Sequence, residues 1–281
     1  MKNAVIICCD NNYIPRAIVA LKQFSSYNPD YHEFIIGTCF DSNMKELCNK
    51  YNIKFIEINL KNDFKNLDKR PYGKEYPIEC FYHFYAYKLL NDFDYILCIE
   101  PDIYTNKQLD IDFEKIKYIG GSYISTELIS KYPPLMKFYE KFKEKYKICH
   151  INQFRILGGV KIYNVKGLEE IDFYKTIVDY YNESWNIGSP RCGDDSLCVM
   201  YQMLNPTKIK LLEQEFHVIH SDQFKNYQKI TFFHFGGNTP KYWKIKGDIK
   251  LKPIILHFYK CMKEFIMNKF SQDFIKKFNL I

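Results

Sequence analysis

The sequence predicts an α/β protein with a mixed, mostly parallel central sheet, flanking helices and a helical extension at its carboxyl end. Short apolar runs alternate with helix-like segments along most of the 281 residues, which is typical of βαβ units. One apolar run, Tyr95–Ile99, continues directly into Glu100-Pro101-Asp102. Open α/β sheets bind ligands at the carboxyl edge of their strands, so we expect these acids at that edge.

The amino-terminal part has a regular βαβαβ pattern. Apolar positions three or four apart predict the helices, and continuous or alternating apolar positions predict the strands. A polar stretch at 61–77, with Asp, Lys, Pro and Gly, predicts a loop that can close over a ligand. The expected elements are strand Ala4–Cys9, helix Pro15–Phe24, strand Phe34–Phe40, helix Met44–Tyr51 and strand Ile53–Leu60.

Beyond this loop the elements follow one another less regularly. Without an internal repeat or a low-complexity linker, the simplest division is one domain at 1–246 and a basic amphipathic extension at 247–281. Besides the acidic strand, we expect helices Ile78–Leu90, Pro134–Lys145, Leu168–Tyr181 and Asp195–Leu204, and strands Tyr118–Ile124, Ile156–Asn164, Ile209–Leu212 and Ile230–Phe235.

Positive charge is concentrated at the carboxyl end. Residues 241–281 hold ten lysines and three acids, which accounts for the whole net charge of +7 and leaves the rest neutral. A neutral body argues against nucleic-acid binding. Two interpretations of the extension stay open: peripheral contact with an anionic membrane or a partner, or packing on the body with solvated lysines.

Cysteine usage and hydropathy bear on the compartment. The ten cysteines form no C-x-x-C pair, and several fall in apolar runs, so we expect small buried hydrophobes in a reducing compartment rather than a zinc site. The first apolar run is too short for a signal peptide, and no run approaches a membrane span. These observations predict a cytoplasmic protein. The oligomeric state stays open, and a homodimer is one option.

Glu100 and Asp102 are the first candidate site residues. Two hard oxygen donors side by side suit Mg²⁺ or Mn²⁺, and such ions usually also hold substrate phosphates. His234 follows a later apolar strand and can supply a third ligand. The alternatives are a loop or helix cap for the acids and a core histidine for His234.

The segment after His234 adds features that a core histidine does not explain. Gly236 and Gly237 allow close backbone approach to a ligand. Lys241 can meet a diphosphate as a point charge. Together with the acids, this segment predicts a phosphate-bearing ligand.

A nucleoside pocket is expected after the first strand, at Cys9-Asp10-Asn11-Asn12-Tyr13. There Tyr13 can stack on a base, and Asp10 or Asn11 can bond to the edge of the base. An ordinary Asp and Asn turn before a helix explains the same residues equally well.

Two further motifs concern the reacting groups. Asp194 and Asp195 precede an apolar helix, where one of them is a natural N-cap; the functional alternative is a carboxylate that orients a hydroxyl acceptor or steadies positive charge at a sugar carbon. Gly158 and Gly159 lie inside a strand, which marks a bulge or close backbone approach.

Taken in order, these residues resemble the glycogenin-like glycosyltransferases, the retaining family 8 group with the Rossmann-like GT-A fold. The resemblance extends from about Ala4 to Trp243. His234, Gly237, Lys241 and Trp243 are similar to the family's H-x-x-G-x-x-K-P-W element, with one extra residue before Lys241.

The resemblance implies a cofactor and a donor. In that family a D-x-D pair and a later histidine bind Mn²⁺, which bridges the diphosphate of a UDP-sugar. By resemblance these roles fall on Glu100, Asp102 and His234, with Mg²⁺ as the alternative ion. Tyr13 matches the uracil-stacking tyrosine, and Cys9 and Pro101 are expected beside the nucleotide.

Some positions depart from the family pattern. Glu100 replaces an aspartate, His83 lies near the position of a basic donor-binding residue, Leu157 replaces an asparagine, and Asp195 replaces a glutamine. By resemblance, Asp194 orients a hydroxyl acceptor on a glycan or a protein, and Asp195 stabilises an oxocarbenium-like sugar or acts as a nucleophile.

Three functions therefore compete. A metal-dependent retaining glycosyltransferase, which moves a hexose or pentose from a UDP-sugar, explains the motifs together. A nucleotidyltransferase that makes a sugar nucleotide would carry a Gly-rich basic loop after the first strand, which 10–13 lacks. A non-catalytic module that binds a sugar nucleotide or a glycan is the alternative from a different class.

Overall fold

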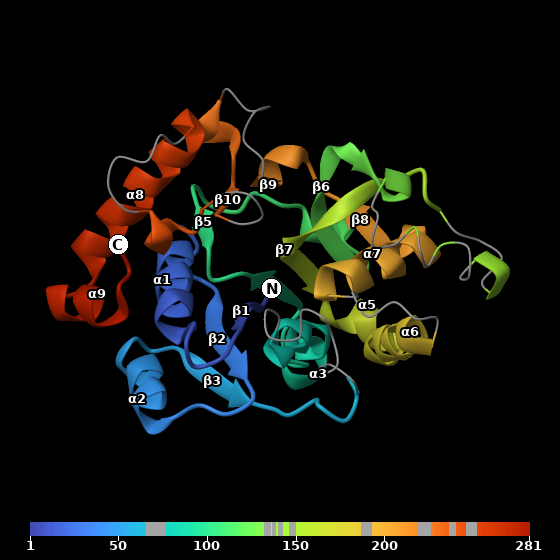
Figure 1. Ribbon diagram of the computed structural model, residues 1–281, viewed down its shortest axis with the longest axis horizontal. Helices are drawn as coiled ribbons and strands as arrows, with labels where there is room; N and C mark the ends of the chain where they lie inside the picture. The colour runs from blue at the N-terminus through green and yellow to red at the C-terminus, as the bar shows by residue number, and fades with distance from the viewer. Residues whose placement is uncertain are drawn as a thin grey trace.

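The computed structural model describes residues 1–65, 77–131, 150–186, 193–218, 226–235, 240–245 and 252–281, with positions 136, 139 and 143–145 between them. Within these ranges the chain forms a seven-stranded sheet with helices on both faces and a separate three-stranded sheet (Figure 1). The predicted helix at 134–145 and most of the predicted loop at 61–77 lie largely outside the described residues.

The central sheet confirms the predicted mixed, mostly parallel arrangement. Only β7 runs antiparallel to its neighbours, β4 and β6, and every other neighbouring pair is parallel. Six strands therefore end at the edge where β7 begins. In spatial order the strands are β3 (Lys54–Glu57), β2 (His32–Gly37), β1 (Asn3–Cys8), β4 (Tyr95–Ile99), β7 (Phe154–Asn164), β6 (Ile119–Leu128) and β8 (Ile209–Leu211).

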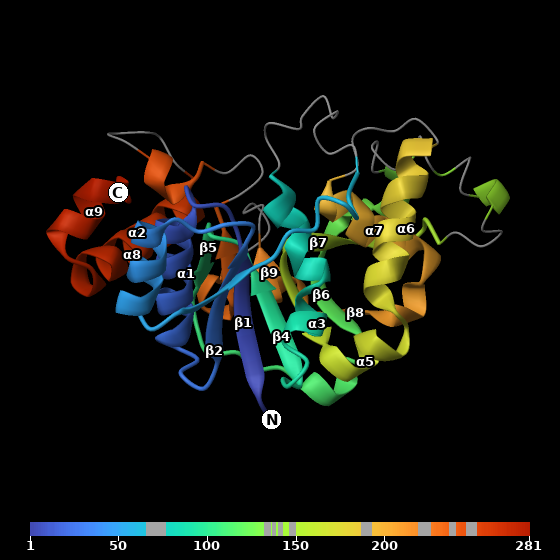
Figure 2. The same cartoon turned by 90° about the horizontal axis from the view of Figure 1, so that it is seen from below.

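The central strands are apolar because both faces of the sheet are covered, as expected for parallel strands. In β1, Val5 and Ile7 face one apolar cluster, and Ala4 and Ile6 face the other. The two groups of helices lie on opposite sides of the sheet (Figure 2). On the first side are α1 (Ile14–Ser25), α2 (Ser42–Lys50), α8 (Pro253–Lys269) and α9 (Gln272–Phe278); on the second are the 3₁₀ helix η2 (Ile78–Phe84), α3 (Ala86–Leu89), α5 (Val165–Glu170), α6 (Phe173–Asn186) and α7 (Asp194–Leu204).

A small second sheet was not predicted. It consists of β5 (Ile103–Thr105), β10 (Phe232–His234) and β9 (His217–Val218), with β10 in the middle. Strands of two or three residues are too short to show a hydrophobic period, so sequence analysis finds only β10. This sheet ties the segment after β4 to the far carboxyl-terminal part of the chain.

Two predicted helices differ from the structure. The helix expected at 78–90 consists of η2 followed by the short α3. The helix expected at 168–181 is divided into α5 and α6 at Asp172, which has a φ of 43°. An L-residue in the left-handed region interrupts a right-handed helix, and aspartate is among the residues that tolerate it.

The carboxyl-terminal extension packs on the body through its apolar face, while its lysines point outward. Phe258 of α8 is fully buried, stacks on Phe233 with ring centroids 4.5 Å apart, and contacts Tyr104 at 5.5 Å. Phe270 and Phe274 pack against Tyr51 at the end of α2. In the described part of the chain, no helix is both long enough and apolar enough to cross a bilayer.

Removing the Phe258 ring should destabilise the whole protein. Phe258→Ala opens a cavity in the core, and such a change typically costs about 3–5 kcal/mol. Leu256→Ala, on the same helix but at a position 38% exposed, should change stability by less than about 0.5 kcal/mol. Urea unfolding measures both; equal effects would show that α8 is not part of the core.

Candidate active site

Three side chains converge at the carboxyl edge of the sheet. The ligand atoms of Glu100, Asp102 and His234 all lie within 4.8 Å of one another. The Nε2 atom of His234 is 3.0 Å from Glu100 Oε2 and 3.2 Å from Asp102 Oδ1. Asp102 and His234 are buried, whereas the Glu100 side chain is 40% exposed. The cluster therefore opens to solvent on the side of Glu100.

A turn and the small sheet bring these residues together. The backbone N–H of Ile103 donates to Glu100 O at 3.2 Å, which closes a turn that contains Pro101. Proline suits the second position of such turns. Ile103 in β5 is paired with His234 in β10, and Phe235 N donates to Asp102 O at 2.9 Å. The antiparallel pairing thus fixes the histidine beside the acids.

The donor set fits a divalent cation. His234 Nε2 is buried and makes no hydrogen bond among the described residues, although two carboxylates face it. An imidazole nitrogen and two carboxylate oxygens around one point suit Mn²⁺ or Mg²⁺. Glu100, Asp102 and His234 are therefore the residues that would hold such an ion.

Without a cation the cluster is held by its own charges. Burial disfavours the imidazolium of His234, but the carboxylates of Asp102 and Glu100 outweigh burial and raise the histidine's pKa. Burial likewise opposes ionisation of Asp102, but His234 and Lys241 lower its pKa. The ammonium of Lys241 contacts Asp102 Oδ2 directly. Lys241 thus lies at the cluster with Asp102 as its partner, and its contact with a diphosphate stays a prediction.

His217 is a site residue that sequence analysis missed. It is almost fully buried in β9, and its Nε2 lies 3.3 Å from His234 Nδ1. Burial and the neighbouring His234 lower the pKa of His217, so its neutral ring can accept the Nδ1–H of His234. Such an outer partner orients a metal-binding histidine. Nothing in the sequence around His217 marks this role.

Gly159 makes room for this histidine pair. A Cβ at Gly159 would lie 2.7 Å from His234 Nδ1 and 3.0 Å from His217 Cε1. The expectation of close approach at the glycines of β7 is therefore confirmed, and side chains rather than a ligand approach here.

Asp194 and Asp195 form a second cluster at the start of α7. Gly193 is the N-cap of this helix, so the N-cap interpretation of the two acids is wrong. Both acids lie in the first turn, where the helix dipole favours negative charge. Neither carboxylate therefore serves as the N-cap of α7.

Asp195 is packed against the backbone of β7. A Cβ added at Gly158 would lie only 1.3 Å from Asp195 Oδ1. That oxygen is buried and has no hydrogen-bond partner among the described residues. Burial, followed by the charge of Asp194, raises the pKa of Asp195 to about 6. Asp195 is therefore a carboxyl group that changes its charge near neutral pH.

His83 belongs to this second cluster. Its Nε2 lies 3.5 Å from Asp194 Oδ2, and its Nδ1 lies 2.6 Å from the hydroxyl of Tyr163. Burial lowers the pKa of His83 to about 4, so the ring is neutral at neutral pH. The structure therefore places His83 against a carboxylate but without the positive charge of a basic residue.

The residues after β1 form a compact turn. Asp10 Oδ1 accepts hydrogen bonds from the backbone N–H groups of Asn12 and Tyr13. The Asn11 side chain bonds to Cys39 O and to the backbone N–H of Asp41. The predicted Asp and Asn turn is therefore present. It presents Tyr13, which is 39% exposed.

Tyr13 is connected to the carboxyl-terminal motif. Its ring meets Trp243 edge to face with centroids 6.1 Å apart, and the Arg16 guanidinium lies 4.8 Å over Trp243. Cys9 is buried beneath, with its N–H bonded to Ile36 O. The predicted nucleoside residues and the segment with Lys241 are thus neighbours. Gly236 and Gly237 lie outside the described residues.

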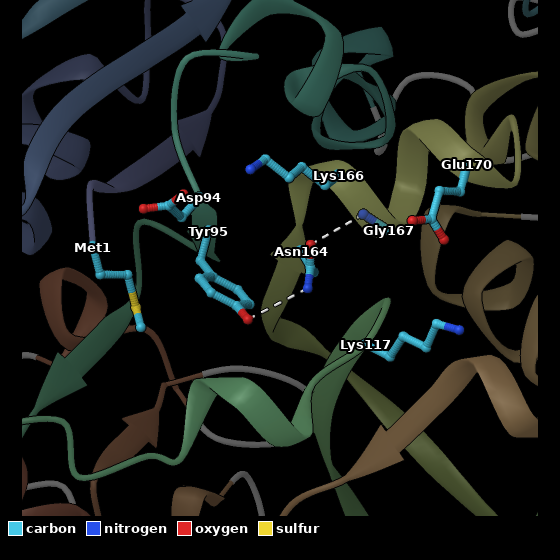
Figure 3. A pocket seen from close by; sticks show the side chains of 8 residues that line it. All are labelled: Met1, Asp94, Tyr95, Lys117, Asn164, Lys166, Gly167 and Glu170. Carbon is cyan, nitrogen blue, oxygen red and sulfur yellow. Dashed lines mark hydrogen bonds between the residues drawn. The ribbon is translucent and has the colours of Figure 1, made fainter.

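A separate pocket of about 430 Å³ lies near the opposite edge of the sheet (Figure 3). Asn164, at its centre, accepts from Gly167 N and donates to Ile116 O, so its amide serves to cap α5. Lys117, Lys166 and Glu170 also line it. These contacts explain the pocket as a feature of the α5 junction.

Comparison with known structures identifies the fold. The sequence matches no family model and no curated protein. The galactosyltransferase LgtC, in complex with donor and acceptor sugar analogues, has a TM-score of 0.67 at 15% identity, with 98% of this chain and 99% of LgtC covered. The bifunctional glycosyltransferase WbbM has a TM-score of 0.64 at 12% identity, with 98% of this chain and 51% of WbbM covered. Core-mannan synthase A from Aspergillus fumigatus, in an Mn/GDP form, has a TM-score of 0.54 at 13% identity, with 92% of this chain and 82% of that protein covered. The chain therefore has the GT-A glycosyltransferase fold.

The two glycines of β7 provide a matched test of the site. Gly159→Ala should displace His234 and weaken Mn²⁺ binding at least tenfold, because the added Cβ takes the place of the imidazole. Gly158→Ala should displace Asp195 instead and leave Mn²⁺ affinity within about twofold of wild type. Isothermal titration with MnCl₂ measures both. Equal losses in the two variants would contradict this assignment.

Proposed function

We propose that the protein is a metal-dependent retaining glycosyltransferase that moves a hexose or pentose from a UDP-sugar to a hydroxyl group of a glycan or a protein. One observation carries the proposal: two carboxylates and an imidazole converge at the carboxyl edge of the sheet, beside a second pair of carboxylates. The solved neighbours in complex with sugar analogues and with Mn and GDP support this class of reaction.

The first cluster serves the leaving group. When bound by Glu100, Asp102 and His234, Mn²⁺ or Mg²⁺ supplies Lewis-acid stabilisation of the negative charge that develops on the diphosphate. Lys241, which contacts Asp102 in this structure, adds a second positive charge at the same place. The partly exposed Glu100 leaves the diphosphate an approach to the cluster.

The second cluster serves the sugar. Asp195 is only partly buried as a residue, so its carboxylate is available to a sugar hydroxyl or to the reacting carbon. Its negative charge stabilises an oxocarbenium-like sugar, or its oxygen bonds to that carbon. Asp194, fixed by His83, orients the acceptor hydroxyl. Asp195 must be ionised both to stabilise the positive sugar and to bond to its carbon.

The nucleoside end is formed by Tyr13 and the turn behind it. A base that stacks on an exposed tyrosine ring contributes about 1–3 kcal/mol. The free edge of Asp10 can accept a hydrogen bond from the N–H of uracil. Uridine is assigned through the family resemblance, and a thermal-shift comparison of UDP with GDP in MnCl₂ decides the base, because the bound nucleotide stabilises the native state.

Turnover of a UDP-sugar should depend on Asp102. Asp102→Ala should lower Mn²⁺-dependent release of UDP at least a hundredfold, because the cluster loses the carboxylate that joins His234 to Lys241. The control Asp179→Ala removes an exposed acid of α6 and should keep wild-type turnover. Wild-type turnover in Asp102→Ala would refute the metal assignment.

The same assay separates the competing functions. If the protein binds UDP in the presence of Mn²⁺ but releases no UDP from any UDP-sugar, it is a binding module. Formation of a UDP-sugar from UTP and a sugar phosphate, with release of pyrophosphate, would identify a nucleotidyltransferase. Glycosyl transfer with retained anomeric configuration, measured by NMR of the product, is the result that the proposal expects.

A further inference from the structure

A buried lysine lies behind the carboxylate pair. Lys161 of β7 is 1% exposed, and its ammonium donates to the carbonyl oxygen of Gly158. Gly158 is the residue whose Cα packs on the Asp195 carboxylate. Lys161 thus binds the backbone unit that supports Asp195.

The surroundings of Lys161 are otherwise apolar. A small cavity is lined by its stem and by the side chains of Ile119, Ile156, Tyr163, Phe173, Cys198, Tyr201 and Ile209. Among the described residues its ammonium makes no direct ion pair. An isolated buried ammonium is costly by several kcal/mol, so a nearby negative charge has to compensate for it.

The two aspartates of α7 supply that charge. Burial disfavours the ammonium of Lys161, but the acidic groups of Cys198, Asp194 and Asp195 act against burial and raise its pKa. Burial raises the pKa of the Cys198 thiol to about 12, so this group is neutral at neutral pH. The two carboxylates therefore carry the compensating charge.

The histidine that contacts Asp194 does not supply a further positive charge. His83, which contacts Asp194, is neutral because burial lowers its pKa to about 4. Asp195 is acted on by Asp194, Lys161, Glu100 and Arg155, in decreasing order. The other titratable groups that interact electrostatically with Lys161 are His83, His217, Cys8, Cys98 and Cys198.

We propose that Lys161 is a positioning residue: its buried ammonium is the fixed counter-charge that allows Asp194 and Asp195 to be ionised together at the sugar end of the site. The catalytic role of Asp195 in this inference rests on the proposed function, whereas the effect of Lys161 on the ionisation of the two aspartates does not. Lys161 acts through the two aspartates and the Gly158 peptide and does not touch the substrate.

The sign of the expected pH effect follows from the charges. A nearby positive charge favours the carboxylate, so removal of Lys161 raises the pKa of Asp195 above its value of about 6. Turnover that needs ionised Asp195 then requires a higher pH. The fold-loss of turnover should grow as the pH falls through 6, and it should disappear at a pH well above the new pKa.

Lys161→Met tests this, because methionine keeps the length of the stem without the charge. We expect the acid limb of the kcat profile to move up by at least one pH unit, with a loss of at least about fivefold at pH 6 that approaches tenfold or more at lower pH. KM for the donor and Mn²⁺ affinity should stay within about twofold. Lys161→Arg restores the charge and should return the limb toward wild type. The proposal would be overturned if the acid limb of Lys161→Met stayed at its wild-type pH, or if kcat fell equally at every pH. It would also be overturned if the acid limb moved equally in the Arg and Met variants.

Two measurements keep the test independent of turnover and of folding. Carbon-13 NMR titration of the Asp195 carboxyl should show the same upward shift in Lys161→Met, even if the protein transfers no sugar. Should Lys161→Met unfold, Lys161→Met/Asp195→Asn should fold, because it removes both members of the charge balance. An unshifted Asp195 or an unfolded double variant would contradict the proposed coupling.

Discussion

The site depends on the buried carboxylate of Asp102, which lies between the imidazole of His234 and the ammonium of Lys241. A carboxylate that is 2% exposed is stable only beside positive charge, whether that charge comes from protein groups or from a cation. The small sheet provides this arrangement by pairing β5 with β10 directly after the acidic turn. A fold that brings these distant segments together therefore creates the metal-binding geometry at the same time.

The antiparallel strand β7 joins the two halves of the site. Gly159 leaves space for His234 and His217, while the neighbouring Gly158 leaves space for Asp195. Further along the strand, Lys161 donates to the carbonyl oxygen of Gly158, and the hydroxyl of Tyr163 is hydrogen-bonded to His83. One strand without side chains at its two crowded positions thus sets how the cluster of Glu100, Asp102 and His234 lies relative to the pair Asp194 and Asp195. This explains why paired glycines occur inside a buried strand.

Much of this architecture could be predicted because it has a local signature. The βαβ alternation predicts the sheet, and the Glu-x-Asp segment directly after β4 predicts two ligands of the candidate metal site, to which the distant His234 adds a third. The strands β5 and β9 could not be predicted, because they are too short for a hydrophobic period. The roles of His217 and Lys161 arise from packing across strands, and Gly193 is the N-cap of α7 although an aspartate beside it has the higher propensity.

The most direct test of this account is the position of a bound cation. Crystals grown with UDP and MnCl₂ should show one anomalous-scattering peak within about 2.0–2.4 Å of Glu100 Oε2, Asp102 Oδ1 and His234 Nε2. Lys241 should then point toward the diphosphate instead of Asp102. A fully bound nucleotide without a peak at these three atoms, or with a peak held by other residues, would contradict the central claim.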